Sequence, residues 1–149
     1  MTPFQLAGCI FCFLVFATVW LKGGHPERLG VTTIVVGWLA SVFASSLTIG
    51  GKVIGVALVD IILTGTFVWM ALRGERWWPF AAAAFMILTL LVYVAVILTP
   101  ELDQRADYAA RLGLFLCVVG TLLIGVAERW AAGERPVSVQ TAWRPRARP

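Results

Sequence analysis

The chain has 149 residues, of which 60% are hydrophobic and only 13% are charged. Soluble domains carry about 25% charged residues, so this composition indicates a protein whose main solvent is lipid. The charged residues lie between long apolar runs, and those runs leave no room for a separate soluble catalytic domain.

Five apolar runs of about 18–21 residues follow one another, close to the length of about 20 that a helix needs to cross a bilayer. Backbone polar groups in lipid must be paired within the segment, so each run is expected to be a helix. The expected spans are residues 4–21, 31–49, 53–72, 79–99 and 108–127. The sequence therefore predicts an all-α membrane protein, a five-transmembrane-helix bundle that forms one domain over residues 1–130.

The connections between these runs are short and carry most of the charge. Residues 23–30 are expected to form a Gly- and Pro-containing loop, residues 50–52 a tight turn, and residues 100–107 an acidic loop. Pro79 suits the first turn of its helix, where a missing N–H costs nothing. The first basic residue is Lys22, which argues against a cleaved signal peptide.

The distribution of Lys and Arg predicts the orientation, because cytoplasmic loops are enriched in them. An N-out, C-in topology places three cations outside and nine in the cytoplasm, which identifies the bacterial inner membrane as the expected location. The nine are Lys22, Arg28, Arg73, Arg76, Arg129, Arg135, Arg144, Arg146 and Arg148. Tryptophan rings anchor helices at the same interface, and the expected anchors are Trp20, Trp69, Trp77, Trp78 and Trp130.

Small residues four apart mark faces where helices can approach closely in lipid. One expected seam consists of Gly37, Ser41 and Ser45, and another of Gly113, Cys117, Thr121 and Gly125. These seams are expected to hold the bundle together, with docking of another membrane protein as the alternative.

Asp60 is the acidic residue that lies within an apolar run, roughly 10 Å deep at 1.5 Å per residue. A carboxylate at such depth costs about 2.5–3.5 kcal/mol unless it is paired or neutral. Arg111 is the expected counter-ion, and Thr64, one turn further on, can donate a hydrogen bond. The plain interpretation is a structural clamp between two helices, and the alternative is proton or cation handling.

Cys9 and Cys12 form a C-x-x-C sequence near the expected outer face, a pattern also found in small quinone-linked thiol oxidoreductases. Reactive thiols need an accessible thiolate near positive charge, and no basic residue lies near this pair. Buried cysteines acting as small hydrophobic residues are the plain interpretation. His25, the single histidine, is expected to be a solvated loop residue, so no metal site and no cofactor are predicted.

Residues 131–149 form a basic, proline-containing tail, expected in the cytoplasm. Arg144, Arg146 and Arg148 are expected to bind anionic lipid or a partner protein. Three arginines with one tryptophan make a weak footprint for nucleic acid, so no nucleic-acid partner is predicted.

Residues 71–79 read ALRGERWWP, after Asp60 and before a run that includes Leu88 and Thr89. This stretch resembles a segment of small uncharacterised bacterial polytopic inner-membrane proteins with an ALRxxRWWP-type cytoplasmic loop. The likeness covers roughly residues 58–99 and implies no activity.

With no catalytic constellation in the sequence, the first functional hypothesis is a non-enzymatic accessory or scaffold subunit. It would pack with itself or with other membrane protein subunits in a larger inner-membrane complex. The second hypothesis is a small oligomeric proton- or cation-linked transporter or channel that uses Asp60. A quinone-linked thiol oxidoreductase acting through Cys9 and Cys12 is the third, and a small pore former is the fourth.

Overall fold

The computed structural model describes residues 3–49, 52–74, 76–99 and 104–133. Within these ranges the chain forms five long helices and one very short antiparallel pair of strands. The helices are α1 (Pro3–Lys22), α2 (His25–Ala44), α3 (Gly55–Arg73), α4 (Trp78–Leu98) and α5 (Gln104–Ala131), and the strands are β1 (Thr48–Ile49) and β2 (Lys52–Val53). The predicted all-α class is confirmed, with the two-residue strands as an addition to it.

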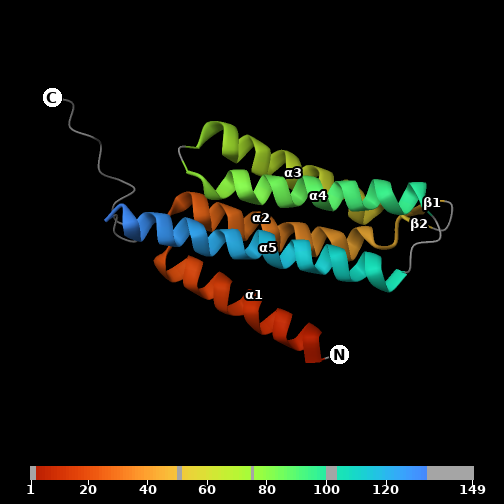
Figure 1. Ribbon diagram of the computed structural model, residues 1–149, viewed down its shortest axis with the longest axis horizontal. Coiled ribbons are helices and arrows are strands. Elements are labelled where there is room, and N and C mark those ends of the chain that lie inside the picture. Colours follow the sequence, from red (N-terminus) through yellow and green to blue (C-terminus); the bar gives the residue numbers. More distant parts are fainter. Residues whose placement is uncertain (1–2, 50–51, 75, 100–103, 134–149) are drawn as a thin grey trace.

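Successive helices run in alternating directions, so the bundle has two distinct ends (Figure 1). We call one the hairpin end; it contains β1 and β2, the ends of α2 and α4, and the starts of α1, α3 and α5. We call the other the tail end; it contains the ends of α1, α3 and α5 and the starts of α2 and α4.

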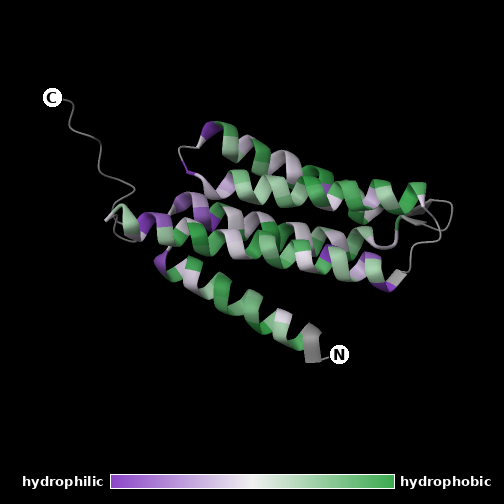
Figure 2. Ribbon diagram, viewed as in Figure 1, coloured by the Kyte–Doolittle hydropathy of each residue, from purple (hydrophilic) through white to green (hydrophobic). Residues whose placement is uncertain are grey.

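Among the described residues, four helices are long and apolar enough to cross a membrane, namely α2, α3, α4 and α5. The apolar part of α1, Leu6–Lys22, is shorter. Figure 2 shows apolar residues along the lengths of the helices and hydrophilic residues gathered toward the two ends. The bundle is therefore a helical membrane protein.

The start of α2 differs from the sequence prediction. Residues 23–30 were expected to form a loop, but α2 begins at His25. Pro26 occupies the first turn, where its fixed φ suits a helix. The carboxylate of Glu27 accepts a hydrogen bond of 2.7 Å from the Gly24 N–H, and the same side chain would not reach back in an extended loop. The helix therefore gains six residues at this end.

The end of α2 differs as well, since the helix stops at Ala44 instead of residue 49. The hydroxyls of Ser45 and Ser46 donate to the carbonyls of Val42 and Phe43 and so compete with the helical pattern. Residues 48–49 and 52–53 then pair as the antiparallel strands β1 and β2. The tight turn predicted at residues 50–52 lies mostly outside the described residues. The helix α5 is longer than predicted, and Asp107 lies in its first turn instead of in a loop.

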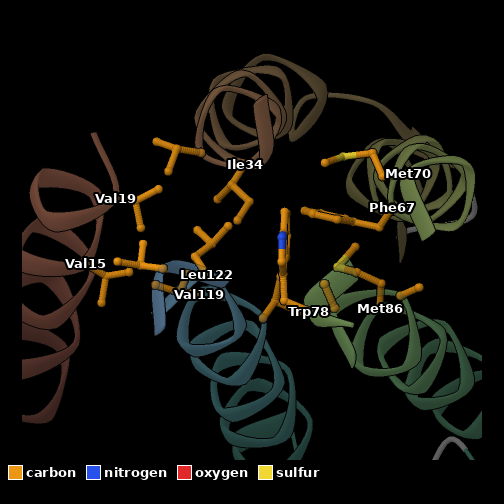
Figure 3. Close-up of a cluster of buried hydrophobic side chains, with 14 residues drawn as sticks. Val15, Val19, Ile34, Phe67, Met70, Trp78, Met86, Val119 and Leu122 are labelled. Atoms are coloured by element: carbon orange, nitrogen blue, oxygen red, sulfur yellow. The ribbon is translucent and has the colours of Figure 1, made fainter. Parts of the chain in front are cut away.

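The core is centred on Trp78, which is 0% exposed and lies among Ile34, Phe67 and Leu122 (Figure 3). Its ring meets the Phe67 ring edge to face, with centroids 6.4 Å apart. Two glycines make room for it. A Cβ added at Gly30 would lie 2.8 Å from Trp78 Cη2, and one added at Gly125 would lie 2.7 Å from Trp78 Cδ1.

The prediction that Trp78 is an anchor at the membrane surface is therefore wrong. Trp77 is the N-cap residue of α4 and Trp78 is its first residue, and the two side chains point in different directions. Trp77 faces outward, with 77% of its surface exposed, while Trp78 fills the slot between α2 and α5. The other predicted anchors, Trp20, Trp69 and Trp130, are exposed at the tail end.

The predicted packing seams are used in part within the chain. A Cβ added at Gly37 would lie 2.6 Å from Leu63 Cδ2, so this glycine lets α2 approach α3 closely. On α5, Thr121 is buried and Gly125 contacts Trp78. By contrast Cys117 and Ser45 are exposed, Ser41 is half-buried, and a Cβ at Gly113 would meet nothing within 4 Å.

Candidate functional site

Asp60 lies in the second turn of α3, near the hairpin end, and is half-buried. Its carboxylate Oδ2 accepts a hydrogen bond of 2.8 Å from the hydroxyl of Tyr93 on α4. The predicted bond from Thr64 takes another form: the Thr64 hydroxyl donates to the backbone carbonyl of Asp60, at 2.7 Å, and not to the carboxylate. Threonine in a helix commonly bonds the carbonyl four residues earlier, and this contact leaves the carboxylate available.

Arg111 lies close to this carboxylate, but the predicted direct ion pair between Asp60 and Arg111 is not formed in the described part of the chain. The Arg111 guanidinium lies over the Tyr93 ring, 4.8 Å from its centroid. It pairs with Asp107, one turn earlier on α5. An acid four residues before a base is the favourable arrangement on a helix, which explains the choice of partner. Tyr93 thus connects the acid on α3 with the base on α5.

Asp60, Tyr93 and Arg111 line a cavity of about 330 Å³ that is bounded by α2, α3, α4 and α5 and is otherwise lined mainly by apolar side chains. Phe67, Met86 and Val118 bound its apolar part, toward the core. A water molecule takes up about 30 Å³ of liquid, so the cavity is large enough to hold several. It offers the polar partners that waters need, namely a carboxylate, a phenol and a guanidinium.

A second hollow, of about 440 Å³, is lined by Arg105, Asp107, Tyr108 and Arg111, and the last two residues line both spaces. On the other side, the packed side chains around Trp78 separate the cavity from the tail end. Two polar residues, Tyr108 and Arg111, are therefore shared by the cavity beside Asp60 and the hollow near the hairpin end.

A second acid lies at the tail end, and its surroundings are different. Glu27 is 0% exposed, and its Oε2 lies 3.7 Å from Nη1 of Arg129 on α5. Arg129 is itself buried, and a Cβ added at Gly24 would overlap its guanidinium. Next to this pair, Glu128 Oε1 accepts a hydrogen bond of 3.2 Å from the Trp77 N–H at the start of α4. The tail end therefore holds α2, α4 and α5 together by packed polar contacts.

Sequence reasoning missed Glu27, Glu128, Arg129 and Tyr93 as members of these clusters. For Glu27 a signal was present, because an acid three residues after a glycine, with proline between, is typical of a helix start. For Tyr93 the signal was weak, since a lone tyrosine in an apolar helix is most often a packing residue. The contact of Tyr93 with Asp60 spans 33 residues and depends on how α3 and α4 pack.

The remaining candidate residues lie apart from Asp60. Cys9 is exposed and Cys12 is half-buried, both with free thiols, and they line an apolar groove of about 680 Å³ between α1 and the helices α2 and α5. His25 is exposed at the tail end. Arg144, Arg146 and Arg148 lie outside the described residues. Within the described ranges, no group of three or more His, Cys, Asp or Glu residues is placed to hold a metal ion.

No protein-family model, no curated protein and no solved structure matches this chain. The likeness of residues 71–79 to a loop of small bacterial membrane proteins stays a prediction.

Proposed function

We propose that this chain is a multi-pass protein of the bacterial inner membrane with five spans. The hairpin end faces outward and the tail end faces the cytoplasm. Nine of the twelve basic residues belong to the tail end or to the sequence that follows it, which supports this orientation. The helix α1 has 20 residues and so is about 30 Å long at 1.5 Å per residue, enough for a fifth span.

We propose further that the protein is a small proton- or cation-linked transporter or channel with Asp60 as its ion site. One observation carries this proposal: the Asp60 carboxylate borders a cavity and is not packed against a counter-ion. An acid that only clamped two helices would gain most from a direct pair in a filled interior. Asp60 instead has one hydrogen bond from Tyr93 and open volume beside it, so water or a cation can reach it.

The neighbours of Asp60 fit the exchange of a proton or a small cation. Arg111 forms an ion pair with Asp107 on the same helix. The Asp60 carboxylate is therefore left to bind a proton or a cation. The Tyr93 hydroxyl can donate to the ionised acid and can turn away when the acid is protonated. Passage to the tail end requires a second arrangement in which the side chains around Trp78 separate, as alternating access demands.

The test is ion flux into liposomes that contain the purified full-length protein. A potassium gradient with valinomycin sets the potential, and internal dyes report protons and monovalent cations. We expect flux by the wild-type protein and its loss in the Asp60→Asn variant. Thr66→Val is the control, since Thr66 is a polar residue on α3, two turns or less from Asp60, that does not line the cavity. A silent wild-type protein, or equal flux in Asp60→Asn, would overturn the proposal.

A second candidate function is that of a subunit in a larger membrane assembly. It is favoured by glycines on the outside of the bundle, since a Cβ added at Gly65 or Gly113 would meet nothing within 4 Å. Such positions let a helix of another protein, or of a second copy, approach the backbone closely. Extraction into native nanodiscs followed by measurement of the particle mass separates a heteromeric assembly from a homo-oligomer or a monomer.

A further inference from the structure

A third hollow lies at the tail end, away from Asp60. It has a volume of about 550 Å³ and lies between the start of α2 and the junction of α3 with α4. We call it the junction groove. Its polar lining consists of His25, Arg73 and Arg76, and its apolar lining includes Leu29, Trp69 and Met70.

The described side chains that line the junction groove carry charge of one sign only. No acidic side chain is among the described residues that line it. The Arg73 guanidinium lies over the Trp69 ring, 5.2 Å from its centroid, so a cation–π contact holds it at the groove. Guanidinium groups bind phosphate through paired N–H donors, and a histidine can add a further donor.

The position of the junction groove restricts what can fill it. It lies where three helices suited to membrane spans, α2, α3 and α4, begin or end. Trp69 and Leu29 are exposed on the outside of the bundle, next to the cationic rim. An occupant must therefore present an anionic group to the arginines while its apolar part runs along lipid-facing side chains.

We propose that the junction groove is a binding site for one anionic phospholipid, with its phosphate at Arg73 and Arg76. The adjoining surface favours a lipid over free phosphate, because the exposed side chains of Leu29 and Trp69 would contact an acyl chain and gain nothing from a small anion. This site is separate from Asp60, so the proposal stands whether or not the protein moves ions.

The test is native mass spectrometry of the delipidated full-length protein, titrated with phosphatidylglycerol or with phosphatidylcholine. We expect one tightly retained phosphatidylglycerol and much weaker retention of phosphatidylcholine. Basic residues near a membrane surface contribute about 1 kcal/mol each, so Arg73→Gln with Arg76→Gln should weaken phosphatidylglycerol binding about tenfold to thirtyfold. Arg105→Gln, at the hairpin end, is the matched control and should leave binding unchanged.

Two further arms make the result decisive. Replacing Arg144, Arg146 and Arg148 together by glutamine should leave the single tight site in place, since the proposed phosphate contacts are Arg73 and Arg76. Excess inorganic phosphate should fail to displace the lipid. The proposal is overturned if phosphate displaces it, if both lipids bind equally, or if the Arg73 and Arg76 variant binds like the wild-type protein.

Discussion

The two ends of the bundle use the same kinds of side chain and differ in how those side chains are packed. At the tail end Glu27 is fully buried, its partner Arg129 is buried, and Trp78 fills the space next to them. At the hairpin end Asp60 is half-buried and borders a cavity, with Tyr93 between it and Arg111. An acid near an arginine therefore occurs in two different surroundings in this protein, one closely packed and one beside a cavity. At the tail end the space around the acid is filled, whereas at the hairpin end open volume remains beside the acid that we propose as the ion site.

Removal of the buried charge at the tail end should have the largest effect on stability. Glu27→Gln leaves Arg129 buried without its counter-charge, and breaking such a pair costs about 3–5 kcal/mol. We expect this loss in the free energy of unfolding, measured by denaturant titration in detergent micelles. The double variant with Arg129→Gln should recover part of the loss. A Glu27→Gln variant as stable as the wild-type protein would contradict the structural role of the pair.

The next largest effect should come from the aromatic ring beside that pair. Trp78→Ala leaves a large hole between α2 and α5, and we expect a loss of about 3 kcal/mol, because core tryptophan truncations cost about 3–5 kcal/mol and lipid lowers the hydrophobic part. Trp77→Ala is the matched control, since this ring is exposed, and it should change the free energy of unfolding very little. Similar losses in both variants would mean that the ring at position 78 does not organise the core.

The smallest change in stability should come with a clear change in flux. Tyr93→Phe removes one hydroxyl and with it the hydrogen bond from α4 to the Asp60 carboxylate on α3. Such bonds between membrane helices average about 0.6 kcal/mol, so the unfolding free energy should fall by about that amount. Flux in liposomes should drop, because the ionised Asp60 loses its donor. Unchanged flux with a large loss of stability would assign Tyr93 to the structure alone.

Much of the fold could be predicted from the sequence because lipid imposes strong rules on it. Apolar runs of the right length placed α1, α3 and α4 within two residues of their observed bounds. The errors fell at helix ends. Short-range polar contacts of Glu27, Ser45 and Asp107 determine where those helices begin or end. Such contacts cannot be recognised from the hydropathy of the sequence.

The candidate site could be predicted only in part. Asp60 and Arg111 were recognisable as charges at similar depth, and the structure brings them to one cavity. The residue between them, Tyr93, depends on the rotation of α4, which an almost uniformly apolar helix does not reveal in its sequence. The same ambiguity concealed the choice between Trp77 and Trp78, because both suit a membrane interface and only packing against Gly30 and Gly125 separates them.

The most direct test compares the two acids in a single sample. Dicyclohexylcarbodiimide reacts with carboxylic acids in apolar surroundings, and peptide mass spectrometry locates the product. In the full-length protein in liposomes, our account predicts that Asp60 is modified well before Glu27, because only Asp60 borders open volume. The Asp60→Asn variant should lose this label and should not gain one at Glu27. Modification of Glu27 as fast as Asp60, or an unreactive Asp60, would contradict the distinction between the two ends.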